Sequence, residues 1–312
     1  MQLHELVNTF GQDLKQRHGQ KIHKLSIHGA FTCPNRDGTL GRGGCTFCNV
    51  SSFADESAQQ LSVVQQLLAR RDEVTRAKRY LAYFQAYTST YAEVEYLQRM
   101  YYEEALSVSD MVGLCVGTRP DCVPDAVLDL LAGYQARGYE VWLELGLQSA
   151  NDKTLQRINR GHGYAAYTDA VARAHQRGIK VCAHLIVGLP GEVAMDSLNT
   201  LQRIVDTGVE GIKLHPLHVV EGSTLGKAWQ AGRLEVPSLA QYVEAAVAMI
   251  QDTPPEVVYH RISASARRPT LLAPAWCENR WTAMADIASE LARSGAQGHA
   301  LGRPFSLSGN IG

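Results

Sequence analysis

The chain has 312 residues, which fits one α/β barrel with short extensions, and its 45% hydrophobic and 20% charged content excludes extensive disorder. A net charge of −1 excludes a global attraction to nucleic acid or to an anionic membrane. The first residues lack the apolar core of a secretion signal and no apolar run approaches about 18 residues, so we expect a cytoplasmic protein with no membrane partner.

Along the chain, a helical segment is followed by alternating β-rich and helical segments. Residues 1–18 have apolar side chains at three-and-four spacing and predict a helix that packs on the outside of the fold. Six β-rich runs follow, at 24–31, 79–87, 111–118, 140–147, 180–189 and 211–220. Segments with helical pattern lie between and after them, at 57–77, 91–106, 124–137, 164–177, 196–207 and 239–252.

Strands joined by crossover helices pair in parallel with right-handed winding. Six such units predict an α/β fold, a partial parallel (β/α)6 barrel of the TIM-like type. We expect residues 1–20 to form an N-terminal helical extension, 21–252 the barrel and 253–312 a C-terminal cap. Because active sites in such folds gather at the carboxyl ends of the strands, the polar and glycine-rich stretches there are the candidate site.

Three of the seven cysteines lie in one glycine-rich loop after the first predicted strand, CPNRDGTLGRGGCTFC, as Cys33, Cys45 and Cys48. Glycines allow a backbone to wrap closely around a bulky group. A zinc site is one interpretation, with His23 or His28 as a fourth ligand, and a thioredoxin-like redox pair is another. Iron–sulfur clusters are usually held by four cysteine thiolates, so three would leave one iron without a protein ligand.

Several long motifs resemble the YhcC-like family of radical S-adenosylmethionine (SAM) proteins, which is related to the radical SAM domain of elongator's catalytic subunit. They are the cysteine loop, YFQAYTSTYA, GLCVGTRPDCV, LELGLQSANDKTLQRINRGH, HLIVGLPGE and HRISASARRPTLLAPAWCENRW. The eleven residues between Cys33 and Cys45 exceed the usual gap of the superfamily, as they do in elongator's catalytic subunit. The resemblance covers nearly the whole chain.

This resemblance implies a 4Fe-4S cluster on Cys33, Cys45 and Cys48, whose open iron chelates SAM. It implies reductive cleavage of SAM to a 5'-deoxyadenosyl radical, with an electron donor such as flavodoxin or ferredoxin. The substrate implied is a tRNA base or a small molecule. A non-enzymatic iron–sulfur redox protein and a zinc-stabilised RNA-binding barrel are the alternatives.

The resemblance also places the contacts to SAM. They are Thr88, Ser89 and Thr90 at the methionyl end, Arg119 at the carboxylate, Glu144, Gln148 and Ser149 at the ribose, and Val187, Gly188 and Glu192 at the adenine. For three of these, an alternative stays open: Arg119 as a cap of its own loop, Glu144 as a buried charge with a partner, and Gly188 as turn chemistry.

Other residues have weaker functional interpretations. Cys122 and Cys277 are candidates to reach the cavity as hydrogen-atom donors, whereas Cys115 and Cys182 lie in apolar strands and are predicted core residues. Histidines near the expected rim are either substrate contacts or ordinary hydrogen-bonding groups: His184, His215 and His218. In the tail, a set of cationic and aromatic side chains suits RNA phosphates and bases, or else packs the cap: Arg261, Arg267, Arg268, Arg280, Trp276 and Trp281.

Overall fold

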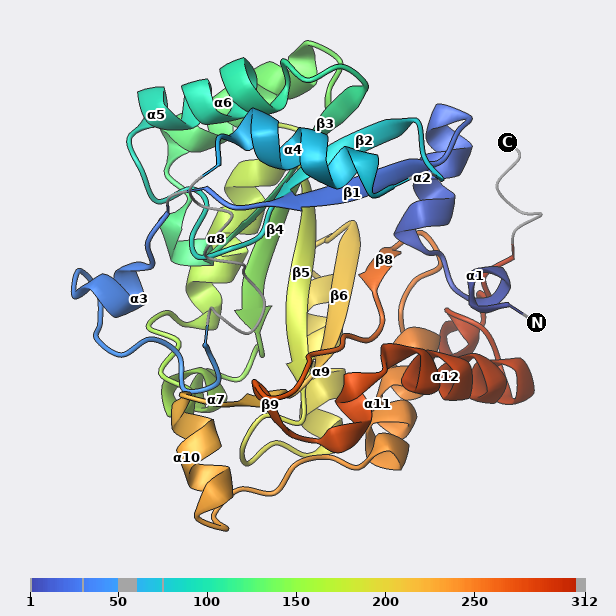
Figure 1. Cartoon of the computed structure of the whole chain (residues 1–312). Helices are drawn as coiled ribbons and strands as arrows, with labels where there is room; N and C mark the ends of the chain where they lie inside the picture. Colours follow the sequence, from blue (N-terminus) through green and yellow to red (C-terminus); the bar gives the residue numbers. More distant parts are fainter. Residues whose placement is uncertain (1, 30, 50–60, 75, 307–312) are drawn as a thin grey trace.

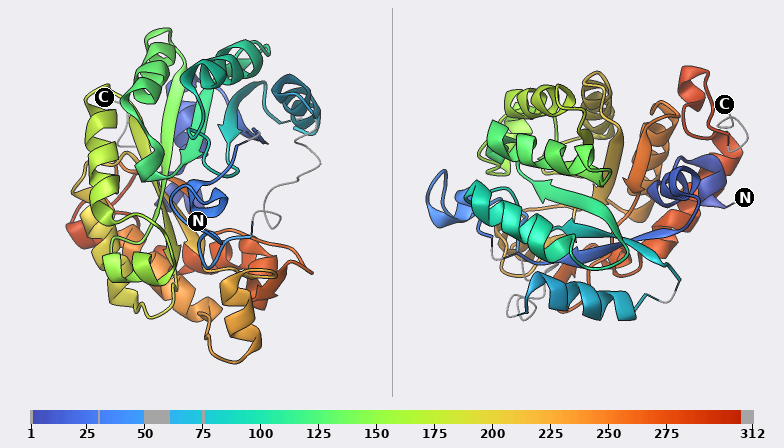
Figure 2. Two further views of the ribbon diagram at one scale, coloured as in Figure 1. Left: turned by 90° about the vertical axis from the view of Figure 1, so that its left-hand side faces the viewer. Right: turned by 90° about the horizontal axis from the view of Figure 1, so that it is seen from above.

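The computed structural model describes residues 2–29, 31–49, 61–74 and 76–306. Seven parallel strands curl into an open half-barrel, in the spatial order β1-β2-β3-β4-β5-β6-β8 (Figures 1 and 2). They are β1 Ile22–Ile27, β2 Arg79–Phe84, β3 Met111–Thr118, β4 Glu140–Gln148, β5 Lys180–Val187, β6 Gly211–Pro216 and β8 Val258–Arg261. The predicted fold class is confirmed.

Helices cover the outer face of the sheet, and their apolar sides form the main core with the outward-facing strand residues (Figure 2). They are α4 Val63–Asp72, α5 Val94–Gln98 with a π-helix at Arg99–Ala105, α6 Asp125–Ala136, α7 Asp152–Arg157, α8 Tyr164–His175, α9 Ala194–Val205 and α11 Leu239–Gln251. The first part of the helix predicted over 57–77 lies outside the described residues. None of the described helices is long and apolar enough to cross a bilayer.

The barrel contains one strand more than the six read from the sequence. The seventh, β8, falls in the segment predicted to be the cap, and it pairs with β6 through Tyr259 and Arg261. Its four residues, VYHR, are too few and too polar to show a strand pattern. Beyond it, β9 (Leu271–Ala273) pairs with β7 (Val219–Val220) in a small antiparallel sheet, and α12 follows at Arg280–Ser294.

The helix predicted over 1–18 is broken and lies elsewhere than expected. It forms α1 (Leu3–Leu6) and α2 (Phe10–His18), because the intervening backbone pairs with β8: the Tyr259 amide donates to the Asn8 carbonyl at 2.8 Å. Phe10 is buried against inward-facing barrel residues, in edge contact with Trp142. The N-terminal segment therefore covers the free edge of the sheet rather than its outer face.

A buried glutamine fixes the same edge from the other end of the chain. The Gln297 amide oxygen accepts from the Asn8 amide at 2.9 Å, and its Nε2 donates to the carbonyls of Pro254 and Val257 at 2.7 and 2.8 Å. The short elements still to be placed are α3 (Pro34–Asp37), α10 (Thr224–Gln230) and 3-10 turns at Pro120–Cys122, Ala275–Glu278 and His299–Leu301.

Candidate active site

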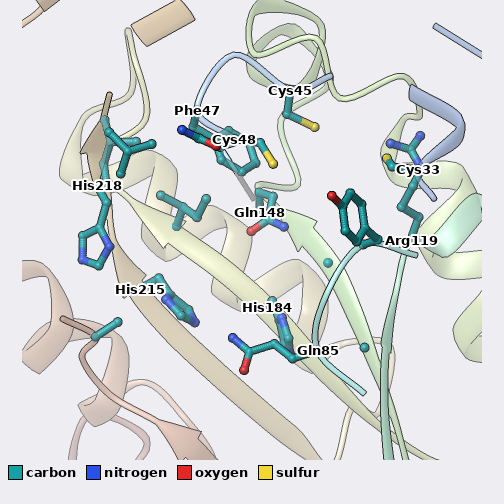
Figure 3. A pocket seen from close by; sticks show the side chains of 18 of the residues that line it. Cys33, Cys45, Phe47, Cys48, Gln85, Arg119, Gln148, His184, His215 and His218 are labelled. Carbon is teal, nitrogen blue, oxygen red and sulfur yellow. The ribbon is translucent and has the colours of Figure 1, made fainter. Parts of the chain in front are cut away.

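A cavity of about 450 Å³ opens at the carboxyl ends of the barrel strands, bounded by the cysteine loop, by β2 to β6 and by the segment after β8 (Figure 3). This is the position at which parallel α/β barrels place their active sites. Its volume lies in the range of small-molecule and cofactor sites, which is roughly 300 to 1,000 Å³.

The three loop cysteines all line this cavity. Cys33 precedes α3, and the helix stops at Gly38, whose φ of +96° lies in the left-handed region that glycine favours. The chain then turns back, so that Cys45 and Cys48 face the same space as Cys33 (Figure 3). In the described part of the chain, no three His, Cys, Asp or Glu side chains converge closely enough to hold a single metal ion.

The loop is anchored to the residues that follow α7. The Thr46 amide donates to the Ile158 carbonyl at 2.9 Å, and Asn159 Nδ2 donates to the Gly44 carbonyl at 2.8 Å. From within the loop, Asn35 Nδ2 donates to the Asn159 carbonyl at 2.6 Å. The loop therefore both donates hydrogen bonds to the segment after α7 and accepts one from it. These bonds fix the position of the loop, whereas a glycine-rich loop without such bonds would be mobile.

Cationic and amide donors surround the cysteine sulfur atoms. Arg160 Nη1 lies 3.4 Å and Asn35 Nδ2 3.6 Å from Cys45 Sγ. Arg36 Nη2 donates to the Cys48 carbonyl at 2.6 Å; burial raises the pKa of the Cys48 thiol, and the Arg36 charge opposes that rise. Donors of this kind stabilise thiolates and sulfur-bound clusters, so the residues fit an iron–sulfur group.

Sequence reasoning missed this donor set. Asn35 and Arg160 stand in motifs that the resemblance uses, CPNRDG and QRINRGH, but neither had a role assigned. The signal available was a polar Asn-Arg pair beside glycines in each motif. Only the fold shows that one residue of each pair, Asn35 and Arg160, reaches Cys45.

Gly161 lies where a larger residue would disturb this arrangement. Its φ is +78°, and a Cβ there would stand 3.0 Å from Asn35 Oδ1 and 3.2 Å from Arg119 Nη2. We expect Gly161→Ala to lower the free energy of unfolding by about 1–3 kcal/mol, through left-handed strain and crowding. Gly133→Ala in α6 is the matched control, since a Cβ there meets nothing within 4 Å and should raise stability by about 0.5–1 kcal/mol. Chemical denaturation compares the two; equal changes would contradict the expectation.

Three of the residues assigned to SAM line the cavity: Thr88, Arg119 and Gln148. Gln148 has φ +79° at a register shift at the end of β4. Arg119 donates through Nε and Nη2 to the Asp121 carboxylate at 2.9 and 2.8 Å, which is the loop-capping alternative. Its Nη1 is buried without a partner among the described residues, so the two N–H groups of this nitrogen remain for a ligand in the cavity.

Six further residues assigned to SAM stand behind the described lining. Ser89 Oγ donates to the Ala86 carbonyl at 3.3 Å, and Thr90 Oγ1 lies 2.6 Å from Thr118 Oγ1. Ser149 Oγ donates to Glu192 Oε1 at 2.5 Å. The other two are Val187 at the end of β5 and Gly188, which packs against the Pro237 ring.

Glu144 differs most from its sequence assignment. It is fully buried beneath the described cavity lining, and Lys24 and Lys213 each donate to its carboxylate. His184 Nε2 and His260 Nδ1 lie 2.9 and 3.3 Å from its oxygens. Burial alone would raise the pKa of Glu144, but the two lysines more than offset it and hold it well below its usual range. The structure therefore shows Glu144 as a buried, paired charge, which is the alternative interpretation of this residue.

The other four cysteines are buried, and none is among the described residues that line the cavity: Cys115, Cys122, Cys182 and Cys277. The structure therefore gives the hydrogen-donor interpretation of Cys122 and Cys277 no geometric support. Cys122 Sγ instead lies 3.8 Å from Asp121 Oδ1. His184, His215 and His218 do line the cavity (Figure 3).

Known protein families and relatives match nearly the whole chain. A model of the radical SAM superfamily matches residues 35–204, and one of the radical SAM C-terminal domain matches residues 209–293. The chain belongs to the radical SAM superfamily. This radical SAM enzyme is 66% identical to Protein YhcC of Escherichia coli strain K12 over 305 residues, 98% of each chain. The resemblance stated from sequence is confirmed.

Two further similarities are more distant. The tRNA uridine(34) acetyltransferase of Dehalococcoides mccartyi is 32% identical over 140 residues, which are 42% of this radical SAM chain and 29% of the relative. A solved structure, the archaeal Methanocaldococcus infernus Elp3, shares the fold with a TM-score of 0.65 at 17% identity, covering 88% of this chain and 64% of that one. The expected relation to elongator's catalytic subunit is thus seen in the fold.

Proposed function

We propose that Cys33, Cys45 and Cys48 bind a 4Fe-4S cluster that leaves one iron open for SAM. When bound, this group supplies the electron that cleaves SAM to methionine and a 5'-deoxyadenosyl radical. The supporting observation is that three thiols face one cavity while Arg160 and Asn35 donate toward Cys45. A flavodoxin or ferredoxin is the proposed electron donor.

The chain's own residues position SAM and exclude water. We propose that the unpartnered Nη1 of Arg119 donates to the SAM carboxylate, where a charge-assisted bond is strong. Thr88 and Gln148 are the further proposed contacts to SAM, and their position in the cavity wall supports this. Six further residues assigned to SAM would act through backbone atoms or by holding the loops at the strand ends in place. They are Ser89, Thr90, Ser149, Val187, Gly188 and Glu192.

For the substrate, we propose a tRNA base. The similarity to a tRNA-modifying relative supports this, as does Trp281, which is exposed with the Arg280 guanidinium 5.0 Å from its ring centroid. Two other tail residues have structural partners instead. Trp276 Nε1 donates to the Pro237 carbonyl at 3.1 Å, and Arg268 pairs with Glu278 at 2.6 Å.

The test is anaerobic purification and reconstitution, followed by metal analysis and reduction in the presence of SAM. We expect about four irons per chain, as in a 4Fe-4S cluster, and release of 5'-deoxyadenosine. Colourless, zinc-loaded protein that binds tRNA would favour the zinc-stabilised RNA-binding barrel. A cluster that never cleaves SAM would favour a redox protein.

A further inference from the structure

Arg261 contributes a cation to the cavity, and no carboxylate of the described residues forms an ion pair with it. It ends β8 in register with Lys213 of β6 and lines the cavity. Its Nη1 lies 3.2 Å from His215 Nε2, and among the described residues no Asp or Glu oxygen lies within 4 Å of it. Because a guanidinium carries five donors and stays charged, most of its hydrogen-bonding capacity is left for a ligand or for water.

The other three arginines of the cavity wall already have partners in the cysteine half. Arg36 donates to the Cys48 carbonyl, Arg119 to Asp121, and Arg160 to the Gly146 carbonyl and toward Cys45 Sγ. The described lining contains no Asp or Glu, although the chain as a whole carries a net charge of −1. The cavity is therefore a local cationic site, with Arg261 its uncommitted charge.

The groups around Arg261 do not supply a counter-charge. Burial, followed by the Arg261 charge, holds the pKa of His215 well below its usual range. Burial also lowers the pKa of His218 to about 4, so both imidazoles are neutral near pH 7. His218 Nε2 is buried without a partner in the described structure, and Ser265 adds a hydroxyl to the same wall. Among the residues that the structure describes, an anion beside Arg261 would meet polar groups and no competing carboxylate.

Two of these groups lie on the far side of the cavity from Cys33. His215 lies in β6 and His218 follows it, and both stand across the cavity from Cys33, which follows β1 (Figure 3). A molecule that filled the space between them would reach the sulfur-lined wall with one end and Arg261 with the other.

We propose that Arg261 binds an oxyanion of the substrate, a phosphate or a carboxylate, beside His215 and across the cavity from Cys33. The planar guanidinium fork matches both groups through two parallel N–H bonds. This inference rests on the proposed function and adds the charge class of the substrate to it. Arg280, whose pKa is lowered by burial and then by the Arg261 charge, would also benefit from an anion nearby.

The experiment measures anion binding by the reconstituted protein directly. Inorganic phosphate and succinate are each titrated against chloride at matched ionic strength, and the melting temperature is followed. We expect Arg261→Gln to weaken binding of the preferred anion about tenfold or more, as for a lost charge-assisted bond. Arg261→Lys, which keeps the charge without the fork, should fall between. Arg233→Gln, at an exposed site, should bind as the unmodified protein does.

Two competitors identify the source of the anion. Displacement of phosphate by tRNA would indicate a nucleotide phosphate, whereas tighter binding of succinate without tRNA competition would indicate a small organic acid; both support the proposal. Displacement of phosphate by saturating SAM would overturn it, because Arg261 would then serve the cofactor. So would equal affinities of the Arg261 variants and the unmodified protein. Iron content and 5'-deoxyadenosine are measured on the same samples, so a failure of the proposed function is seen separately.

Discussion

Cys45→Ala is expected to abolish reductive cleavage of SAM. Cys45 is the most buried of the three loop cysteines, and its Sγ accepts hydrogen bonds from both Arg160 Nη1 and Asn35 Nδ2. Loss of an outer partner of a metal ligand commonly costs about 10–100-fold, so loss of the ligand itself should cost more than about 100-fold. The measurement is 5'-deoxyadenosine released per chain under reducing conditions, together with iron content.

Cys115→Ala provides the matched control for this change. Cys115 is a fully buried cysteine of β3 that packs in the barrel interior and is not among the described residues that line the cavity. The variant should lose about 1 kcal/mol of stability and retain its iron and its cleavage rate. Full cleavage activity in Cys45→Ala would refute the assignment of the cluster to this loop.

Glu144→Ala should destabilise the fold rather than weaken SAM binding alone. The carboxylate is the only described acidic partner of the buried Lys24 and Lys213 ammonium groups. Removing one member of a buried ion cluster typically costs about 3–5 kcal/mol, since the remaining charges stay buried without compensation. Denaturant unfolding near pH 6.5, where both lysines are protonated, measures the loss.

The pH dependence of this loss has a definite sign. Lys213 and Lys24 hold the folded-state pKa of Glu144, against the effect of burial, well below the ordinary glutamate value of about 4.5. Its contribution to stability is therefore fully present above that value and is lost as the pH falls toward the folded-state pKa. The difference in unfolding free energy between unmodified protein and variant should shrink on acidification from pH 6 to below 4.5.

A double variant separates charge pairing from other effects. Glu144→Gln with Lys213→Met removes one charge of each sign and should be more stable than Glu144→Gln alone, in which both lysines lack a described acidic partner. If Glu144→Ala kept full stability yet bound SAM more weakly, the original assignment of Glu144 to the ribose would return.

Local patterns predicted the barrel and the cysteine loop well, because strand, helix and ligand signals lie within short stretches. The short strand β8 escaped, since its inward residues His260 and Arg261 are polar. The contacts of Cys45 with Arg160 and of Glu144 with Lys24 were not predicted for a different reason. The two residues of each contact are 115 and 120 positions apart in the sequence, respectively. Such pairings follow from the strand order, which no single motif contains.

The bridge between Thr9 and Tyr259 also bears on how the molecule assembles. It closes a loop of some 250 residues. The conformational entropy lost on closing this loop opposes formation of the bridge, so the bridge adds to stability only after that entropic cost has been offset. Each of the strands β1 to β6 pairs with a strand close to it in the sequence. The pairing between Thr9 and Tyr259 instead joins two segments that are far apart in the sequence. Because ribosomal synthesis produces Thr9 some 250 residues before Tyr259, this edge of the half-barrel can close only after β8 has emerged.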